Sequence, residues 1–332
     1  MDVNSIESNN TDQKSINPLI EQFSNFLFKI ENDLTRELDI YSWSEFYSPL
    51  KYACEGGKRI RPLILVLSSE IIRSKYQPNT SYFLNKDRFD SKTSRNDYSK
   101  NIINESNNID QKVYLAASAI ELLHTESVIH DDIIDKDLVR RGKPSFHVKY
   151  GYNKSILTAD FVLGIILNIT SKLNNPKISS EIAKASIRMS EGEVMEMKLN
   201  KDNNITETDY IKVLENKTAA LFESSARIGA ILGGGTDEDI QAMGNFGNLI
   251  GIAYQIHDDL EDWNNEERLF NLLMRQKNYS KIFVKNMEIL YKSYSNKAKN
   301  ELNLVTRNVE DKSSKQLVQQ LAELTNLNVL PI

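Results

Sequence analysis

Residues 127–135 read Ser-Val-Ile-His-Asp-Asp-Ile-Ile-Asp, and residues 254–262 read Tyr-Gln-Ile-His-Asp-Asp-Leu-Glu-Asp. In each segment the last five residues carry acidic groups at the first, second and fifth positions, so in a helix the first and last share a face about one turn apart. Carboxylates this close repel one another unless cations lie between them. Because Mg²⁺ prefers one or two carboxylates together with phosphate oxygens and water, the two segments predict magnesium sites and a diphosphate ligand.

A solvated helix face is the alternative interpretation of one such acidic cluster. Both clusters, however, are embedded in apolar sequence, with Val128-Ile129 before the first and residues 249–254 before the second. Charged groups inside buried helices need a partner. Two copies in apolar surroundings therefore favour a metal and diphosphate site.

The sequence around these clusters has a helical period almost throughout. Apolar residues recur at three- and four-residue steps from Leu19 to Leu38. Alternating strand patterns are scarce, and only 7 Pro and 13 Gly interrupt the helices. These features predict an all-α protein, a single large helical bundle over residues 18–332. Further helices are predicted over residues 43–55, 62–74, 113–136, 155–173, 179–200, 207–232, 237–266, 279–305 and 312–325.

The composition agrees with an enzyme-sized globular body. A chain of 332 residues with 40% hydrophobic residues can bury a substantial core. The net charge of -5 and the pI near 5.6 argue against a nucleic-acid partner. Cys54 is the only cysteine, so no intrachain disulfide can form and a reducing compartment is expected.

Three segments bear on order and location. Residues 1–17 are polar and lack the apolar centre of a secretory signal, so they are predicted to be a disordered tail. The apolar stretch from Ile156 to Ile169 is interrupted by polar residues and shorter than a bilayer span, which indicates a buried helix. A cytoplasmic protein without a transmembrane segment is expected. Residues 74–111 are rich in Asn, Ser, Asp and Lys, which predicts a flexible insertion or a lid.

Two basic segments complement the acidic ones. Residues 56–62 read Gly-Gly-Lys-Arg-Ile-Arg-Pro, a turn whose backbone N–H groups and following helix N-terminus favour an anion, with Lys58 and Arg61 one turn apart. Residues 140–144 read Arg-Arg-Gly-Lys-Pro and add two guanidiniums suited to bidentate phosphate contact. The alternatives are a basic surface turn for the first segment and cations at a helix C-terminus for the second.

Together these motifs resemble those of the trans-isoprenyl diphosphate synthases, the polyprenyl synthetase family. In chain order they are GGKRIRP at 56–62, ELLHTESVIHDDIIDKDLVRRGKPSFH at 121–147, a Gly-Glu-Val helix at 192–194, Lys217-Thr218, and YQIHDDLED at 254–262. The resemblance runs from about Leu19 to Trp263. It implies the isoprenoid synthase type I fold, an all-α bundle around a central cavity, normally homodimeric, with the two aspartate motifs facing each other across the mouth.

The resemblance also implies a role for each matching residue. The implied metal ligands, for three Mg²⁺ ions once substrate is bound, are Asp131, Asp132, Asp135, Asp258 and Asp262. The implied catalytic set adds Asp259, Lys217 and Thr218. Isopentenyl diphosphate would be bound by Lys58, Arg61, His124 and Arg141. The allylic diphosphate would be gripped by Arg140, and its site would be lined by Lys217, Thr218 and Gln255.

The implied reaction is a magnesium-dependent prenyl transfer that makes trans-prenyl diphosphates. An allylic diphosphate ionises, the double bond of isopentenyl diphosphate attacks the carbocation, and a proton is lost to the released diphosphate. No dedicated protein base is required, which fits a sequence without a convincing nucleophile or catalytic triad.

In this family the product length depends on residues one or two turns before the first aspartates. Here these residues are Leu123, Glu126 and Ser127, and none is aromatic. The absence of a bulky floor predicts geranylgeranyl diphosphate, with twenty carbons, or longer products. Glu126 is unusual, because a carboxylate facing a prenyl tail is costly unless it has a partner.

The chain departs from the family pattern after Asp262. Many relatives continue with Gly-Lys-Pro and a further Lys-Thr pair, whereas residues 263–268 read Trp-Asn-Asn-Glu-Glu-Arg. Lys277 and Lys281 are candidates to replace the missing cation. The departure leaves two alternatives open: a non-catalytic prenyl-binding subunit of a heteromeric synthase, and a class I terpene cyclase.

Overall fold

The computed structural model describes residues 23–77, 97–202, 204–261, 269–278, 280–306 and 312–324. Within these ranges the regular secondary structure is helical apart from one short hairpin, which confirms the predicted all-α class. The elements are α2 (Ser24–Asp39), α3 (Tyr47–Cys54), α4 (Ile60–Tyr76), α6 (Asp97–Ile134), β1 (Val139–Arg140), β2 (Lys143–Pro144), α7 (Phe146–Tyr150), α8 (Tyr152–Leu173), α9 (Pro176–Leu199), α10 (Glu207–Leu214), the π-helical segment η2 (Glu215–Ala219), α11 (Ala220–Leu232), α12 (Asp237–Glu261), α13 (Leu269–Gln276), α14 (Lys281–Val305) and α15 (Lys312–Glu323).

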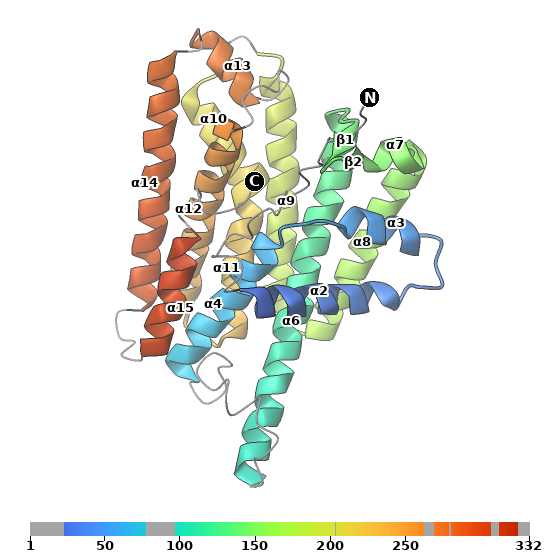
Figure 1. Cartoon of the computed structure of the whole chain (residues 1–332), viewed down its shortest axis with the longest axis vertical. Coiled ribbons are helices and arrows are strands. Elements are labelled where there is room, and N and C mark those ends of the chain that lie inside the picture. Colours follow the sequence, from blue (N-terminus) through green and yellow to red (C-terminus); the bar gives the residue numbers. More distant parts are fainter. Residues whose placement is uncertain are drawn as a thin grey trace, which may run out of the picture.

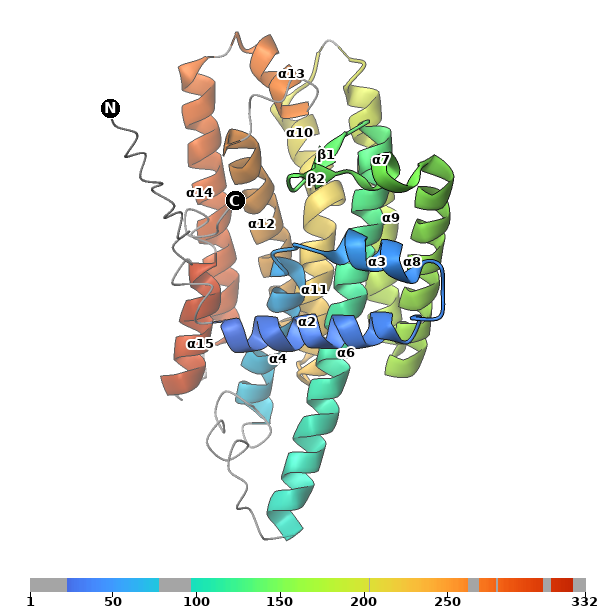
Figure 2. The ribbon, with the colours of Figure 1, turned by 45° about the vertical axis from the view of Figure 1, so that its right-hand side comes forward.

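Long helices run side by side along the longest axis of the molecule, and α2 crosses them (Figures 1 and 2). Helix α11 lies in the middle, because it contacts α4, α6, α9 and α12. Helix α12 also packs against α14, and α6 also packs against α8. The C-terminal part of α6, the hairpin, α10 and α13 all lie toward one end of the bundle (Figures 1 and 2).

Helix α4 forms much of the core. Every residue from Pro62 to Ser74 is buried. Burial on every side is the pattern of a helix surrounded by other helices, and the buried charges of Glu70 and Arg73 pair with each other. Helix α11 comes close to it at Gly229, where an added Cβ would overlap the carbonyl oxygen of Leu65.

The helices extend into the predicted insertion from both sides. Helix α4 continues to Tyr76, and α6 begins at Asp97 rather than near residue 113. Ion pairs hold this polar sequence in place: Arg73 Nη1 lies 2.7 Å from Asp110 Oδ1, and Lys75 Nζ lies 2.8 Å from Asp239 Oδ1. Residues 78–96 and the predicted tail 1–17 lie outside the described residues.

The apolar stretch predicted as a buried helix lies in α8, and the prediction is wrong for one side of the helix, where Ile156, Leu157, Leu163 and Leu167 are exposed. Helix α8 has 22 residues and is, by length and composition alone, long and apolar enough to cross a membrane. Buried core helices pass the same test, and 39% of its most apolar window is buried. One side of α8 packs against α6, α7 and α3.

Candidate active site

A cavity of about 560 Å³ lies among α4, α6, α9, α11 and α12, with α10 and α13 in its wall. Residues of the acidic motifs and of the basic motifs both line this cavity. The predicted residues that line it are Lys58, Arg61, His124, Ser127, Asp131, Asp135, Arg140, Arg141, Lys217, Thr218, Gln255, Asp258 and Asp259. Leu123, Glu126 and Asp132 line neighbouring pockets, and Asp262 lies outside the described residues.

The first and third aspartates of α6 face the cavity. Burial raises the pKa of Asp131 to about 7 and that of Asp135 to about 6. The Lys217 ammonium opposes the shift in both cases, and the carboxylates of Glu193 and Glu196 add to it. Carboxylates that are partly desolvated and crowd each other in this way are suited to bind a cation.

The middle aspartate of this motif points elsewhere. Asp132 is 2% exposed, and its Oδ1 lies 2.6 Å from Arg140 Nη2 and accepts a 2.8 Å hydrogen bond from Arg140 Nε. Consecutive helical residues project about 100° apart, so Asp132 cannot share the face of Asp131 and Asp135. The structure therefore does not bring the predicted metal ligand Asp132 into the cavity but sets it against Arg140.

On α12 the two adjacent aspartates also differ. Asp258 lines the cavity. Asp259 is buried and accepts two hydrogen bonds, from Tyr210 Oη at 2.6 Å and from Gln255 Nε2 at 3.0 Å. Gln255 Oε1 in turn accepts from Thr218 Oγ1 at 3.0 Å.

On the basic side of the cavity, one hydrogen-bond donor of Arg61 has no acceptor among the described residues. Arg61 packs over the ring of Phe222, with Cζ 4.7 Å from the centroid. Its Nε is buried and has no hydrogen-bond acceptor among the described residues. Its Nη1 lies 3.3 Å from Nε2 of His124, whose pKa is held well below its usual range by burial and by Arg61 and Arg141 nearby. A neutral imidazole beside a partly buried guanidinium leaves positive charge for an incoming anion to balance.

Arg59, between the two predicted phosphate contacts, has a structural role that the sequence did not reveal. It stands in the left-handed region at the N-cap of α4, with φ of 55°. Its guanidinium is buried between Glu121 and Glu31, with Nη1 2.6 Å from Glu121 Oε1 and Nη2 2.5 Å from the carbonyl oxygen of Cys54. An added Cβ at Gly57 would overlap Arg59 Nη1, which explains why glycine precedes Lys58 here.

The hairpin positions the arginine pair. Arg141 and Gly142 form its two-residue loop with φ of 53° and 72°, the positive values that a type I′ turn requires. Arg141 Nη1 donates to the carbonyl oxygen of Glu55 at 3.0 Å, so the hairpin is tied to the turn before α4. Arg140 and Arg141 thus both reach the cavity wall.

Lys217 and Thr218 lie in the π-helical segment η2, within a region predicted as one continuous helix. Such segments are frequent at functional sites. Lys217 Nζ lies 2.5 Å from Glu193 Oε2 and 2.7 Å from Glu196 Oε2, and although burial lowers the Lys217 pKa, these carboxylates and Asp131 raise it on balance. The sequence singled out the Gly-Glu-Val run but not the pairing of its glutamate with Lys217.

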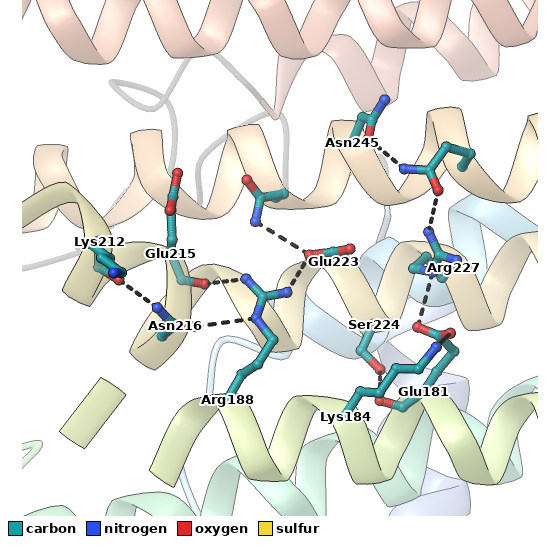
Figure 3. A network of polar contacts seen from close by, with 12 residues as sticks. Glu181, Lys184, Arg188, Lys212, Glu215, Asn216, Glu223, Ser224, Arg227 and Asn245 are labelled. Atoms are coloured by element: carbon teal, nitrogen blue, oxygen red, sulfur yellow. Dashed lines mark hydrogen bonds and ion pairs between the residues drawn. The ribbon is translucent and has the colours of Figure 1, made fainter. Parts of the chain in front are cut away.

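Neighbouring groups brace this segment. Arg188 of α9 donates to the carbonyl oxygen of Glu215 at 2.7 Å and to Glu223 Oε2 at 2.5 Å (Figure 3). Asn216 donates to the carbonyl oxygen of Lys212 at 2.8 Å (Figure 3). Close packing completes the contact, since a Cβ added to Gly192 would overlap the backbone nitrogen of Lys217.

A second pocket of about 290 Å³ adjoins the cavity and shares Ser127, Asp131, Met189 and Lys217 with it. Its wall is mixed: it includes the predicted chain-length residues Leu123, Glu126 and Ser127, the apolar residues Ile134, Met189, Val194 and Met197, and polar residues such as His130 and Glu193. Glu126 has a partner, because its Oε1 lies 3.4 Å from His130 Nδ1. Burial nevertheless raises the pKa of Glu126.

Residues 44–321 match the polyprenyl synthetase family. The chain belongs to this family. A geranylgeranyl diphosphate synthase from Methanosarcina mazei is 30% identical over 250 residues, which are 74% of this chain and 67% of that protein. A geranylfarnesyl diphosphate synthase from the same organism is 35% identical over 212 residues, or 64% of this chain and 60% of that protein.

Solved structures agree with the polyprenyl synthetase family. A geranyltranstransferase from Methanosarcina mazei aligns with a TM-score of 0.67 at 29% identity, covering 92% of this chain and 97% of that one. The resemblance and the isoprenoid synthase fold class that the sequence predicted are therefore confirmed. The relatives named here are prenyl-transferring enzymes, the class predicted for this chain.

Proposed function

We propose that the protein condenses isopentenyl diphosphate with an allylic diphosphate in the 560 Å³ cavity. One observation carries the proposal. Carboxylates on α6 and α12 line the same cavity as Arg61, whose buried Nε lacks an acceptor among the described residues. A diphosphate supplies the acceptors for Arg61, and cations between diphosphate and carboxylates relieve the crowding at Asp131 and Asp135.

The donor set suits Mg²⁺. Asp131 and Asp135 offer carboxylate oxygens from α6 and Asp258 from α12, with Asp262 as a further proposed ligand. Within the described ranges no three His, Cys, Asp or Glu side chains come close enough to hold a metal by themselves. Mg²⁺ binds through one or two carboxylates plus phosphate and water, so the diphosphate would complete each site, with three ions proposed. Bound Mg²⁺ would supply positive charge at the leaving group.

The two substrates have separate binding groups. We assign isopentenyl diphosphate to Lys58, Arg61, His124 and Arg141, because these residues share the wall nearest the start of α4. The allylic diphosphate is assigned to Arg140, which Asp132 holds in orientation. Lys217, which Glu193 and Glu196 hold beside Asp131, can approach the same diphosphate.

The reaction follows from this placement. The carbon–oxygen bond of the allylic diphosphate breaks, and the pair of electrons leaves with the diphosphate, whose negative charge the cationic side chains stabilise. The oxygens of Thr218 and Gln255 present dipoles to the allylic cation. The double bond of isopentenyl diphosphate attacks this cation and forms the new carbon–carbon bond. Loss of a proton to the departing diphosphate restores a double bond.

The second pocket supports a long product. It continues from the cavity beside Asp131 and is lined by Leu123, Glu126 and Ser127, with no Phe, Tyr or Trp among the described residues of its wall. Products of twenty carbons or more fit this opening, and relatives such as the geranylgeranyl and geranylfarnesyl synthases agree with it.

The decisive experiment sizes the products. Purified protein is incubated with Mg²⁺, labelled isopentenyl diphosphate and, in turn, dimethylallyl, geranyl or farnesyl diphosphate. We expect a ladder that ends at twenty carbons or beyond, and a loss of about 10²–10³-fold in rate for Asp131→Asn. Product dominated by the fifteen-carbon farnesyl chain would contradict the chain-length assignment, and no product with any primer would contradict the synthase assignment.

A single variant separates a synthase from a terpene cyclase. Lys58→Ala removes a cation assigned to isopentenyl diphosphate alone. We expect the KM for isopentenyl diphosphate to rise about tenfold or more, while the KM for the allylic substrate stays within about twofold, because a charged hydrogen bond contributes about 1.5–3 kcal/mol. Consumption of an allylic diphosphate without isopentenyl diphosphate, at a rate unaffected by this variant, would favour a cyclase.

A homodimer completes the proposal. Helix α8 forms one outer edge of the bundle (Figures 1 and 2) and exposes a row of large apolar side chains. These are Ile156, Leu157, Leu163 and Leu167 on α8, with Ile187 exposed on α9. Apolar rows of this kind mark an interface, and a second copy of the chain is the proposed occupant.

Cytoplasmic location and the lack of a nucleic-acid partner stay predictions from composition.

A further inference from the structure

Beneath the allylic side of the cavity, a chain of three hydrogen bonds joins four residues from α10, η2 and α12. Tyr210 Oη donates to Asp259 Oδ2 at 2.6 Å, and Gln255 Nε2 donates to Asp259 Oδ1 at 3.0 Å. Thr218 Oγ1 donates to Gln255 Oε1 at 3.0 Å. We propose that Tyr210 is a positioning residue for prenyl transfer: through Asp259 it fixes the orientation of the Gln255 amide. This inference rests on the proposed function.

The direction of each bond follows from chemistry. The Asp259 carboxylate accepts hydrogen bonds only, so a group that touches it at this distance must donate. Gln255 must then turn its NH₂ group toward Asp259 and its carbonyl oxygen toward Thr218. The reversed amide would place an oxygen against the carboxylate, with two acceptors and no proton between them.

This orientation matters for the reaction. Gln255 and Thr218 both line the cavity, so the amide presents the negative end of its dipole on the side where the allylic cation forms. A dipole that is aligned before the reaction needs no reorganisation during it, and such preorganised groups contribute much of the electrostatic stabilisation of a transition state. The effect is on the cation and not on either diphosphate.

Tyr210 can fix the orientation of the Asp259 carboxylate because its own hydroxyl has a fixed position. Its ring is 1% exposed and packs against Phe270 with centroids 5.6 Å apart, so the hydroxyl has a fixed position. With Oδ2 held by Tyr210, the Asp259 carboxylate can rotate only by breaking a short buried hydrogen bond. Without Tyr210, the carboxylate loses this restraint, and the Gln255 amide that it orients is held less firmly.

The test compares two tyrosines that make the same kind of bond. Tyr210→Phe removes the hydroxyl and keeps the ring. Tyr76→Phe is the matched control, because Tyr76 Oη donates to Asp239 Oδ2 at the same 2.6 Å. Tyr76 is the last residue of α4, whereas the site residue Arg61 is near the first. We expect Tyr210→Phe to lower kcat about tenfold, with both KM values within about twofold, and Tyr76→Phe to leave kcat unchanged. An equal kcat in the two variants would overturn the proposal.

A double-mutant cycle adds a readout that a merely structural role would not move. Gln255→Leu removes the amide dipole, and we expect Tyr210→Phe to cause no further loss of kcat in that background. Losses that multiply independently would overturn the role through Gln255. If Tyr210→Phe does not fold, Asp259→Asn in the same cycle gives the answer, since it replaces the acceptor-only carboxylate by a group that can pair with either end of the amide. A wild-type protein that makes no prenyl product would instead refute the proposed function.

Discussion

At the residue scale, Arg59 shows how a buried ion pair can set the geometry of a binding turn. Its guanidinium pairs with Glu121, which is three residues before His124 on α6, and with Glu31. Burial lowers its pKa, but the two carboxylates outweigh this and the net shift is upward. The residue therefore stays charged and links α2, α6 and the turn that carries Lys58 and Arg61.

We expect Arg59→Gln to lower the free energy of unfolding by about 3–5 kcal/mol, because Glu121 would be left buried without its charge partner. The KM for isopentenyl diphosphate should rise as well, since the turn loses its anchor. Denaturant unfolding and steady-state kinetics check both effects. Lys177→Gln is the control, because Lys177 and Asp237 form an exposed pair and no measurable change is expected. Equal stability of the two variants would contradict the anchoring role.

The reactivity of the Cys54 thiol tests the packing of the same region. Burial raises its pKa to about 11, although Arg59 nearby lowers it in part. A raised thiol pKa favours the neutral form, so at pH 8 only roughly 0.1% is the reactive thiolate. We expect native protein to resist a thiol reagent at pH 8 and to react stoichiometrically in guanidinium chloride. Since Cys54 is the only cysteine, rapid labelling of the native protein would show that this packing opens.

The sequence predicted which residues gather at the site better than it predicted where each one points. Asp131 and Asp135 follow from helical spacing alone, and they do share a face. The position of Asp132 against Arg140 depends on the hairpin at residues 139–144, whose two-residue strands are too short to give an alternating pattern. The hydrogen bonds of Tyr210 and Arg59 join residues far apart in the chain, which no local pattern reveals.

At the element scale, η2 separates α10 from α11 within a region whose apolar period predicted one helix. A π segment adds one residue to a turn, and apolar periodicity over a whole helix does not resolve a change that small. The long α6 was missed for a different reason: its first part is polar, and its place is fixed by ion pairs such as Arg73 with Asp110.

Gly192 tests the packing of α9 against η2. We expect Gly192→Ala to lower the free energy of unfolding by about 1–3 kcal/mol and to reduce activity, because the added Cβ overlaps the backbone of Lys217 and cannot be relieved by a side-chain movement. Gly164→Ala in α8 is the matched control, since no atom lies within 4 Å of its added Cβ. Alanine there should be neutral or stabilising by about 1 kcal/mol. A Gly192→Ala protein as stable and active as the control would contradict this contact.

At the scale of the whole molecule, α8 has two different sides. Its inner side belongs to the bundle and includes Val162, Ile166 and Ile169, all buried. Its outer side carries the exposed leucines, of which Leu167 is 61% exposed. Apolar composition on both sides explains why the helix passes a membrane-span test by composition. A second copy of the chain would bury the outer side without any membrane.

The mass in solution tests this interface. We expect a particle of twice the 38.0 kDa chain mass by light scattering after gel filtration, and we expect the double variant Leu163→Glu/Leu167→Glu to run as a monomer, because the charges would have to be buried unpaired. Ile289→Glu on α14 is the control: Ile289 is also exposed, and the variant should stay dimeric. A wild-type mass of one chain, or binding to neutral lipid vesicles that the double variant abolishes, would contradict the dimer and assign the outer side of α8 to a membrane surface.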